Sequence, residues 1–318
     1  MKRPRGLLGV AVALSVAAAV PCAPSPGPPV FRASVESVYV DVFVSRQGQP
    51  VPGLQASNFE LKDNGVRQVA ELLVAEAQPL RSVLVFDTSS SLVGERLAAL
   101  KDAGKAFLDG LRPEDQVALV GFSEEIAWLA PSTADKTAVR RALDNLEAAG
   151  TTAAFDALYA AVALSEPAGR SLIVLFTDGE DNMSVLSQKQ LVTMVERSNA
   201  LVHTVGWREP GVTSEPGLIT AEITVPNQAL PSLRQIAEVT GGRFWWADSP
   251  EQLRRAFAEI ADSMSRRYIL RYEAQGVKRE GWHRIEIKLR GQKGDLQARH
   301  GYWVAPPRET EGAPHRSP

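Results

Sequence analysis

The stretch SVLVFDTSSSL, residues 82–92, passes within a few positions from an apolar run to a run of side chains that carry oxygen. A short, non-alternating run of Val, Leu and Phe is typical of a strand that is buried on both faces, as in a parallel sheet. Asp87, Ser89 and Ser91 follow where this strand ends. A Ser-rich turn would by itself explain these residues, so the choice between a turn and a binding site depends on the remaining sequence.

Three further apolar runs of the same kind follow along the chain: QVALVGFS (116–123), SLIVLFTD (171–178) and LVHTVGW (201–207). Between the runs, apolar residues recur at helical spacing, and one such segment starts at Ser249-Pro250, which is typical of a helix N-terminus. Strands that alternate with helices predict a doubly wound, mostly parallel α/β sheet with helices on both faces, over residues 82–265. His203 falls inside one of the runs and is interpreted as a core residue.

The segments on either side of this region have a different pattern, with apolar and polar residues in alternation. SVYVDVFVS (37–45) reads as a half-buried strand, and NFELKDNGVRQ (58–68) reads as a hairpin with Asn64-Gly65 at its tip. Three more strands are expected after the last helix, and they are too few to bury a core alone. We therefore expect residues 31–76 and 266–306 to pack together as one small β-sandwich-like domain.

The first residues have the order of a secretory signal. Lys2, Arg3 and Arg5 precede an apolar run that ends before Cys22. We expect a signal peptide over residues 1–23, a Pro-rich linker over 24–30 and a disordered tail over 307–318, in a protein exported to the periplasm, the cell envelope or the medium. No other stretch is apolar enough to cross a membrane, so the mature chain is expected to have no transmembrane span.

Cys22 is the only cysteine, so no internal disulfide can form. Its position makes it a candidate for a lipid anchor, but Pro21 directly before it is unfavourable and plain cleavage is preferred. The formal net charge of −2 argues against a nucleic-acid partner.

Oxygen-bearing side chains follow two of the predicted strands, and others lie in a loop between these strands in the sequence. In open parallel sheets, sites form outside the carboxyl ends of strands, where Asp87 and Asp178 are expected. The loop AGTTAAFDAL (149–158) adds Thr151 and Thr152 directly before a helix. Hard oxygen ligands without His or Cys predict Mg²⁺, with Mn²⁺ or Ca²⁺ as alternatives. Neutral hydroxyl ligands would leave such an ion able to attract an acidic oxygen from outside.

Asp87-Thr88-Ser89-Ser90-Ser91 resembles the D-x-S-x-S motif of von Willebrand factor type A domains. Thr152 in GTTAAFDAL and Asp178 in FTDGED match the other two elements of the family, in the same order. The resemblance covers residues 82–265, and the flanking segments GQPVPGLQASNFELKDNG and ARHGYWVAP also look like those of bacterial von Willebrand factor A-related proteins.

The resemblance implies a metal-ion-dependent adhesion site. Ser89, Ser91 and Thr152 would lie near the metal, and Asp87 and Asp178 would act partly through waters. A Glu or Asp of a partner protein would complete the coordination. Thr151 is the alternative to Thr152, which is favoured because it directly precedes Ala153-Ala154-Phe155-Asp156.

These observations predict an exported, metal-dependent protein-binding module of the adhesion or scaffold type, without enzymatic activity. One alternative is a Mg²⁺-assisted hydrolase of the cell envelope that acts on phosphate or ester groups, for which Asp181 is the only nearby base. A second alternative is a structural envelope protein whose metal only holds loops together.

Overall fold

The computed structural model describes residues 37–73, 78–165, 170–179, 181–208, 229–278 and 280–305. The predicted signal peptide, the Pro-rich linker, Cys22 and the C-terminal tail lie outside these residues. Among the described residues, no helix is long and apolar enough to cross a membrane.

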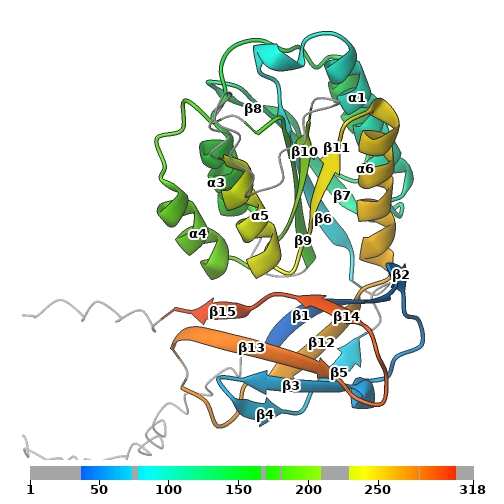
Figure 1. Cartoon of the computed structure of the whole chain (residues 1–318), viewed down its shortest axis with the longest axis vertical. Helices are drawn as coiled ribbons and strands as arrows, with labels where there is room; N and C mark the ends of the chain where they lie inside the picture. Colours follow the sequence, from blue (N-terminus) through cyan, green and yellow to red (C-terminus); the bar gives the residue numbers. More distant parts are fainter. Residues whose placement is uncertain are drawn as a thin grey trace, which may run out of the picture. The chain divides into compact units, whose positions relative to one another are not determined.

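A central sheet runs in the order β11-β10-β9-β6-β7-β8 (Figure 1). Its strands are β6 (Leu80–Asp87), β7 (Gln116–Phe122), β8 (Ile126–Thr133), β9 (Arg170–Thr177), β10 (Leu201–Trp207) and β11 (Phe244–Ala247). Neighbouring strands are parallel, except that β8 runs antiparallel to β7. The apolar runs occupy the four inner strands, where both faces are buried.

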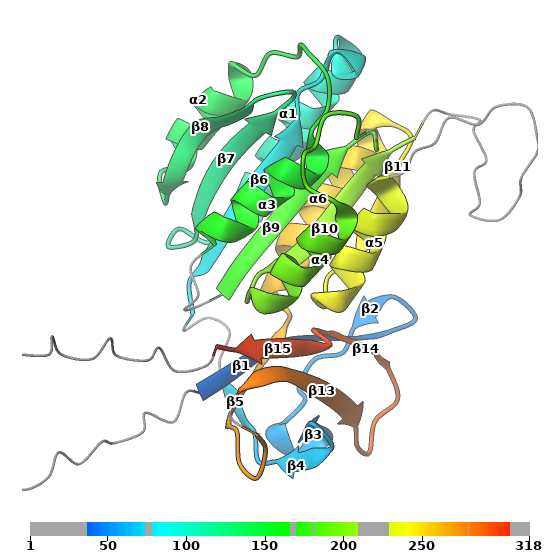
Figure 2. The same cartoon turned by 90° about the vertical axis from the view of Figure 1, so that its left-hand side faces the viewer.

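Helices cover both faces of this sheet (Figure 2). One face packs against α1 (Glu95–Asp109), α2 (Lys136–Asp144) and α6 (Pro250–Ser265). The other face packs against α3 (Ala154–Leu164), α4 (Gln188–Arg197) and α5 (Ala229–Val239). Ser249 caps α6, and its side chain accepts a hydrogen bond from the N–H of Gln252. The predicted doubly wound α/β class is confirmed.

Two smaller sheets contain strands from both ends of the described chain. The first has the order β14-β1-β12-β5, with β2 paired to β1, and consists of β1 (Ser37–Arg46), β2 (Gln49–Pro50), β5 (Glu71–Leu73), β12 (Tyr268–Glu273) and β14 (Asp295–Ala298). The second has the order β15-β13-β3-β4, from β3 (Phe59–Asp63), β4 (Val66–Gln68), β13 (Gly281–Leu289) and β15 (Gly301–Val304).

The two sheets enclose one core, to which Val40, Val42, Leu61, Leu270 and Ile285 contribute. β3 and β4 form the predicted hairpin, and both turn residues have positive φ, 45° at Asn64 and 81° at Gly65. A β-sandwich built from both chain ends thus accompanies the α/β part, as the predicted fold class requires.

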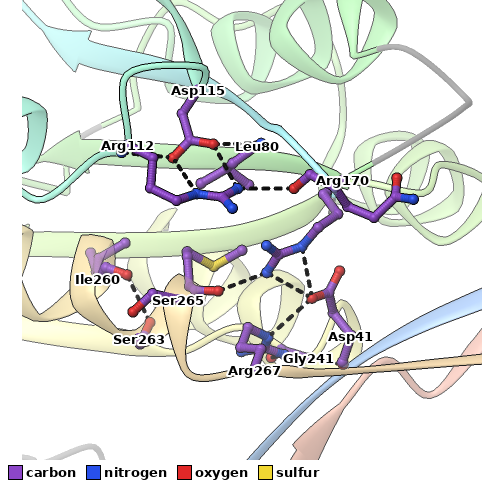
Figure 3. A network of polar contacts seen from close by, with 12 residues as sticks. Asp41, Leu80, Arg112, Asp115, Arg170, Gly241, Ile260, Ser263, Ser265 and Arg267 are labelled. Carbon is purple, nitrogen blue, oxygen red and sulfur yellow. Dashed lines mark hydrogen bonds and ion pairs between the residues drawn. The ribbon is translucent and has the colours of Figure 1, made fainter. Parts of the chain in front are cut away.

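An ion-pair network joins β1 of the sandwich to the α/β part (Figure 3). Arg170 donates to Asp41 Oδ1 over 3.1 Å and to the carbonyl of Met264 over 2.8 Å. Arg267 donates to the carbonyls of Asp41 (3.2 Å) and Gly241 (3.0 Å). Both arginines are buried. Asp41 lies on the face of β1 that turns away from the sandwich core. Through Asp41, this face of β1 contacts Arg170 and Arg267 of the α/β part.

Candidate functional site

Asp87 ends β6, between β7 and β9, and its side chain is fully buried. Its Oδ1 accepts the N–H of Ser89 (2.9 Å) and its Oδ2 accepts the hydroxyl of Thr177 (2.8 Å). Burial, followed by the nearby Asp178 carboxylate, raises the pKa of Asp87 to about 6, against the lowering effect of the hydrogen bonds from Ser89 and Thr177. The orientation of this carboxylate is therefore fixed by neighbouring groups before any ligand arrives.

A single turn of 3₁₀ helix, η3 (Ser90–Leu92), follows Asp87 and brings the two predicted serines together. Ser89 Oγ and Ser91 Oγ lie 3.0 Å apart. Ser91 Oγ also donates to Asp178 Oδ2 over 2.5 Å. Asp178 follows β9, the neighbour of β6, so the parallel pairing delivers both carboxylates to the same edge of the sheet. Asp87, Ser89, Ser91 and Asp178 are thus joined by hydrogen bonds into one cluster of oxygen atoms.

The loop that carries Thr151 and Thr152 is hydrogen-bonded to the loop after β6. The N–H of Ala149 donates to the carbonyl of Thr88 (2.8 Å), and the N–H of Ser90 donates to that of Gly150 (3.0 Å). Gly150 has a φ of +85°, and a Cβ there would lie 1.9 Å from Oε2 of Glu124. Other residues would be strained at this φ, so glycine favours this backbone path.

Thr151 and Thr152 differ in their surroundings. Thr151 is exposed, and its N–H and hydroxyl donate to Oε2 of Glu124 (2.7 and 3.3 Å). Thr152 is buried, its N–H donates to Oδ1 of Asn182 (3.1 Å), and its carbonyl accepts the N–H groups of Asn182 and Met183 (both 3.1 Å). The loop that follows Asp178 is therefore fastened to Thr152 through the backbone.

Asp181 acts as a helix cap at this site. Its Oδ2 accepts the N–H of Phe155 in the first turn of α3 (3.0 Å), and its Oδ1 accepts the N–H of Ser184 (3.1 Å). Asp156 completes the link in the opposite direction, because its carboxylate accepts the N–H groups of Val185 (2.9 Å) and Leu186 (3.0 Å). Capping side chains satisfy N–H groups that have no partner inside the helix. Asp156, Asp181 and Asn182 were not predicted to position the site, and the only sequence signal for them is their ability to form local caps.

The donor set suits a hard divalent cation. Its atoms are carboxylate and hydroxyl oxygens, which Mg²⁺ prefers. With Mg–O distances of about 2.1 Å, neighbouring ligands on an octahedron are about 3.0 Å apart, and Ser89 Oγ and Ser91 Oγ have that separation. Clusters of three or more His, Cys, Asp or Glu side chains that could hold a metal do not occur among the described residues, so the hydroxyls are essential to this fit.

Residues 82–180 match the family model of the von Willebrand factor type A domain. The resemblance that the three motifs indicated is confirmed over these residues, which lie in the α/β part of the chain. A solved structure, von Willebrand factor type A from Catenulispora acidiphila, has a TM-score of 0.52 and 17% identity over 80% of this chain and 75% of its own. At that identity the likeness shows the fold alone.

Two curated bacterial proteins are also similar in sequence. A UPF0353 protein of Mycolicibacterium paratuberculosis is 28% identical over 198 residues, which are 56% of this chain and 58% of that protein. A UPF0353 protein of Mycobacterium sp. (strain KMS) is 26% identical over 250 residues, which are 69% of this chain and 72% of that protein. The match thus spans less than two thirds of the first of these relatives.

Proposed function

We propose that this chain is an exported, metal-dependent protein-binding module. Asp87, Ser89, Ser91, Thr152 and Asp178 would hold Mg²⁺, or Mn²⁺ or Ca²⁺ in its place, and the ion would bind a Glu or Asp carboxylate of a partner protein. The observation that carries this proposal is the oxygen cluster, in which Ser91 Oγ lies 3.0 Å from Ser89 Oγ and 2.5 Å from Asp178 Oδ2.

When bound, the ion would supply a positive charge with a coordination position open to the partner. The residues of the chain supply the arrangement. Ser89 and Ser91 are neutral, so Asp87 and Asp178 offset only part of the charge of the ion. Thr177 orients Asp87, and Ser91 orients Asp178. Because these side chains are held before the ion binds, little conformational entropy is lost on binding.

Binding without catalysis is supported by the role of Asp181. The hydrolase alternative requires a base beside the metal, and Asp181 was the only candidate. Both of its carboxylate oxygens accept backbone N–H groups, from Phe155 and Ser184. Protonation of this carboxylate during a reaction would weaken the cap of α3, so Asp181 is better suited to hold the loop than to move a proton.

The metal site is tested by the stability of the folded chain in urea, with and without Mg²⁺. At a Mg²⁺ concentration of about 100 times its Kd, a site present only in the folded state adds about 2.7 kcal/mol to the free energy of unfolding. Asp87→Ala should lose this gain, whereas Asp102→Ala, an exposed acid on α1, should keep it. Ser91→Ala, which removes only the hydroxyl that contacts Ser89 and Asp178, should lose the gain as well. A wild-type chain that gains no more from Mg²⁺ than Asp87→Ala does would refute the site.

Capture of a carboxylate is tested separately. Wild-type chain on beads is incubated with cell-envelope extract in Mg²⁺ and then eluted with EDTA, with Asp87→Ala as the control. The proposal expects a protein that elutes with EDTA only from wild type, and that stops binding when one Glu or Asp is changed to Gln or Asn. If chelation instead lowers stability and releases nothing, the metal only holds loops together. Turnover in a phosphatase or esterase panel that disappears in Asp87→Ala would favour the hydrolase.

Export is tested by expressing the full chain with a C-terminal tag in a bacterium and separating the cell fractions. We expect the tagged protein in the envelope or medium, with its N-terminus after residue 23. Retention of Met1 in a cytoplasmic product would contradict export, and a lipid on Cys22 would replace plain cleavage by lipid anchoring.

A further inference from the structure

Two tryptophans are exposed side by side on the outer face of the sheet β15-β13-β3-β4. Trp282 in β13 and Trp303 in β15 are direct cross-strand partners, and their exposed fractions are 38% and 37%. The side chains that alternate with them, His283 and Tyr302, are buried between the two sheets. The outer face of a half-buried sheet normally carries polar residues, so two neighbouring indoles there are unusual.

The indole of Trp282 lies against the sheet, above Gly301. A Cβ at Gly301 would be 2.3 Å from Cζ2 and 2.7 Å from Cε2 of that ring. Glycine at this position therefore makes room for the ring to rest on the backbone of β15. Trp303 is held by a cation–π contact, because the guanidinium of Arg197 in α4 lies 4.5 Å from its ring centroid. Each ring therefore has a defined neighbour, and the two exposed indoles lie on adjacent strands.

The same face is positively charged. Strand register and alternation place four cations and two carboxylates on the outside of these fully described strands: Lys62, Arg67, Arg284, Lys288, Glu60 and Glu286. Arg197 adds a further positive charge beside Trp303. The chain as a whole carries a formal charge of −2. This local excess of positive charge favours an anionic ligand.

We propose that this face, with Trp282 at its centre, binds an acidic polysaccharide. The C–H groups on one side of a sugar ring would stack on the exposed indole, whose face carries partial negative charge. Arg284 lies opposite Gly301, next to the ring, and its side chain is 73% exposed, so it can bind a uronate carboxylate. Oε1 of Glu286 lies 3.6 Å from Nε of Arg284, and this carboxylate can accept a hydrogen bond from a sugar hydroxyl.

An anionic membrane surface is the competing ligand, and the geometry argues against it. Interfacial binding requires apolar side chains that reach into the lipid. The Trp282 ring lies on the sheet, and the carboxylates of Glu60 and Glu286 share its face. A polysaccharide makes use of both features, since its hydroxyls both donate and accept hydrogen bonds.

The test is calorimetric titration of the full chain with oligogalacturonate, a polymer of anionic sugars. EDTA is present and the Asp87→Ala background is used, so that sugar carboxylates cannot bind through a metal at the other site. We expect binding that weakens with salt, with about a tenfold loss of affinity in Trp282→Ser. Tyr39→Ser is the matched control, because Tyr39 is an aromatic side chain, 50% exposed, on the other sheet of the sandwich, and it should bind as the background protein does.

Arg284→Gln keeps the proposal testable if Trp282→Ser does not fold, because this exposed side chain can be changed without disturbing the core. It should weaken oligogalacturonate by about three- to tenfold while the melting temperature stays unchanged. Equal affinity of the background protein, Trp282→Ser and Arg284→Gln would overturn the proposal. Binding to vesicles that contain anionic phospholipid, without binding to oligogalacturonate, would also overturn it and would identify the face as a membrane surface.

Discussion

His203 in β10 should make the stability of this protein fall in mild acid. Its ring is buried, and its Nδ1 accepts the backbone N–H of Arg243 over 2.9 Å, so Nε2 carries the proton of the neutral ring. Nε2 is also buried and has no hydrogen-bond partner within the described part of the chain. Burial, followed by the charge of Arg267, lowers the pKa of His203 from 6.5 to about 3.

The sign follows from where the proton binds. Between pH 6.5 and pH 3, His203 of the unfolded chain takes up a proton and His203 of the folded chain does not, so stability falls as the pH falls. With these two pKa values, His203 should reduce the free energy of unfolding by about 2 kcal/mol between pH 7.5 and pH 5.0. Asp87 acts in the opposite direction, because its raised pKa lets the folded state take up a proton first.

The contribution of His203 is isolated by comparison with His203→Asn, which keeps a side-chain acceptor for the N–H of Arg243. Both proteins contain Asp87, so its effect cancels in the difference. Urea unfolding at pH 7.5 and pH 5.0 should show wild type losing about 2 kcal/mol more than the variant. A difference between the two proteins that is the same at both pH values would show that the folded chain protonates His203 normally, and the reasoning from burial would be refuted.

Two further predictions concern polar contacts away from the oxygen cluster. Asp41→Asn should lower the free energy of unfolding by about 2 kcal/mol, because it leaves the buried Arg170 and Arg267 without a counter-charge; an equally stable variant in urea would contradict this role. Asp181→Ala should cost about 1 kcal/mol in the same assay, because the N–H of Phe155 in α3 keeps only the hydroxyl of Ser184 as a side-chain acceptor, and it should also weaken Mg²⁺ binding by calorimetry. Unchanged Mg²⁺ affinity in the destabilised variant would show that the cap does not position the site.

The sequence indicated the class of fold because its hydrophobic patterns are local. A continuous apolar run such as Leu172 to Phe176 satisfies only a strand that is covered on both faces, and the structure places it at the centre of the sheet. β8 was not predicted. Its sequence, IAWLAPST, lacks alternation, and three consecutive residues, Ala127 to Leu129, are exposed at the edge of the sheet. An edge strand obtains much of its definition from its neighbour, which a local pattern does not contain.

The candidate site divides in the same way. Strand ends and the order of the motifs predicted Asp87, Ser89, Ser91, Thr152 and Asp178 as one group, and their metal-binding role stays a prediction. The caps around this group could not be read from the sequence. Asp178 and Asp181 are alike in type and lie three residues apart, yet one accepts the hydroxyl of Ser91 and the other accepts backbone N–H groups of α3 and its own loop.

The sequence by itself therefore determined the inner strands of the α/β sheet, the residues that carry oxygen at their ends, and the two alternating segments that must pair with each other. These properties depend on the spacing of residue types along the chain, which can be read directly from the sequence. The tertiary structure alone decided the contacts between distant segments: Asp41 with Arg170, Asp181 with α3, and Trp282 above Gly301. The fold decides which distant residues become neighbours, and close packing then limits each polar or aromatic side chain to those neighbours. The same side chain would have other partners in another fold.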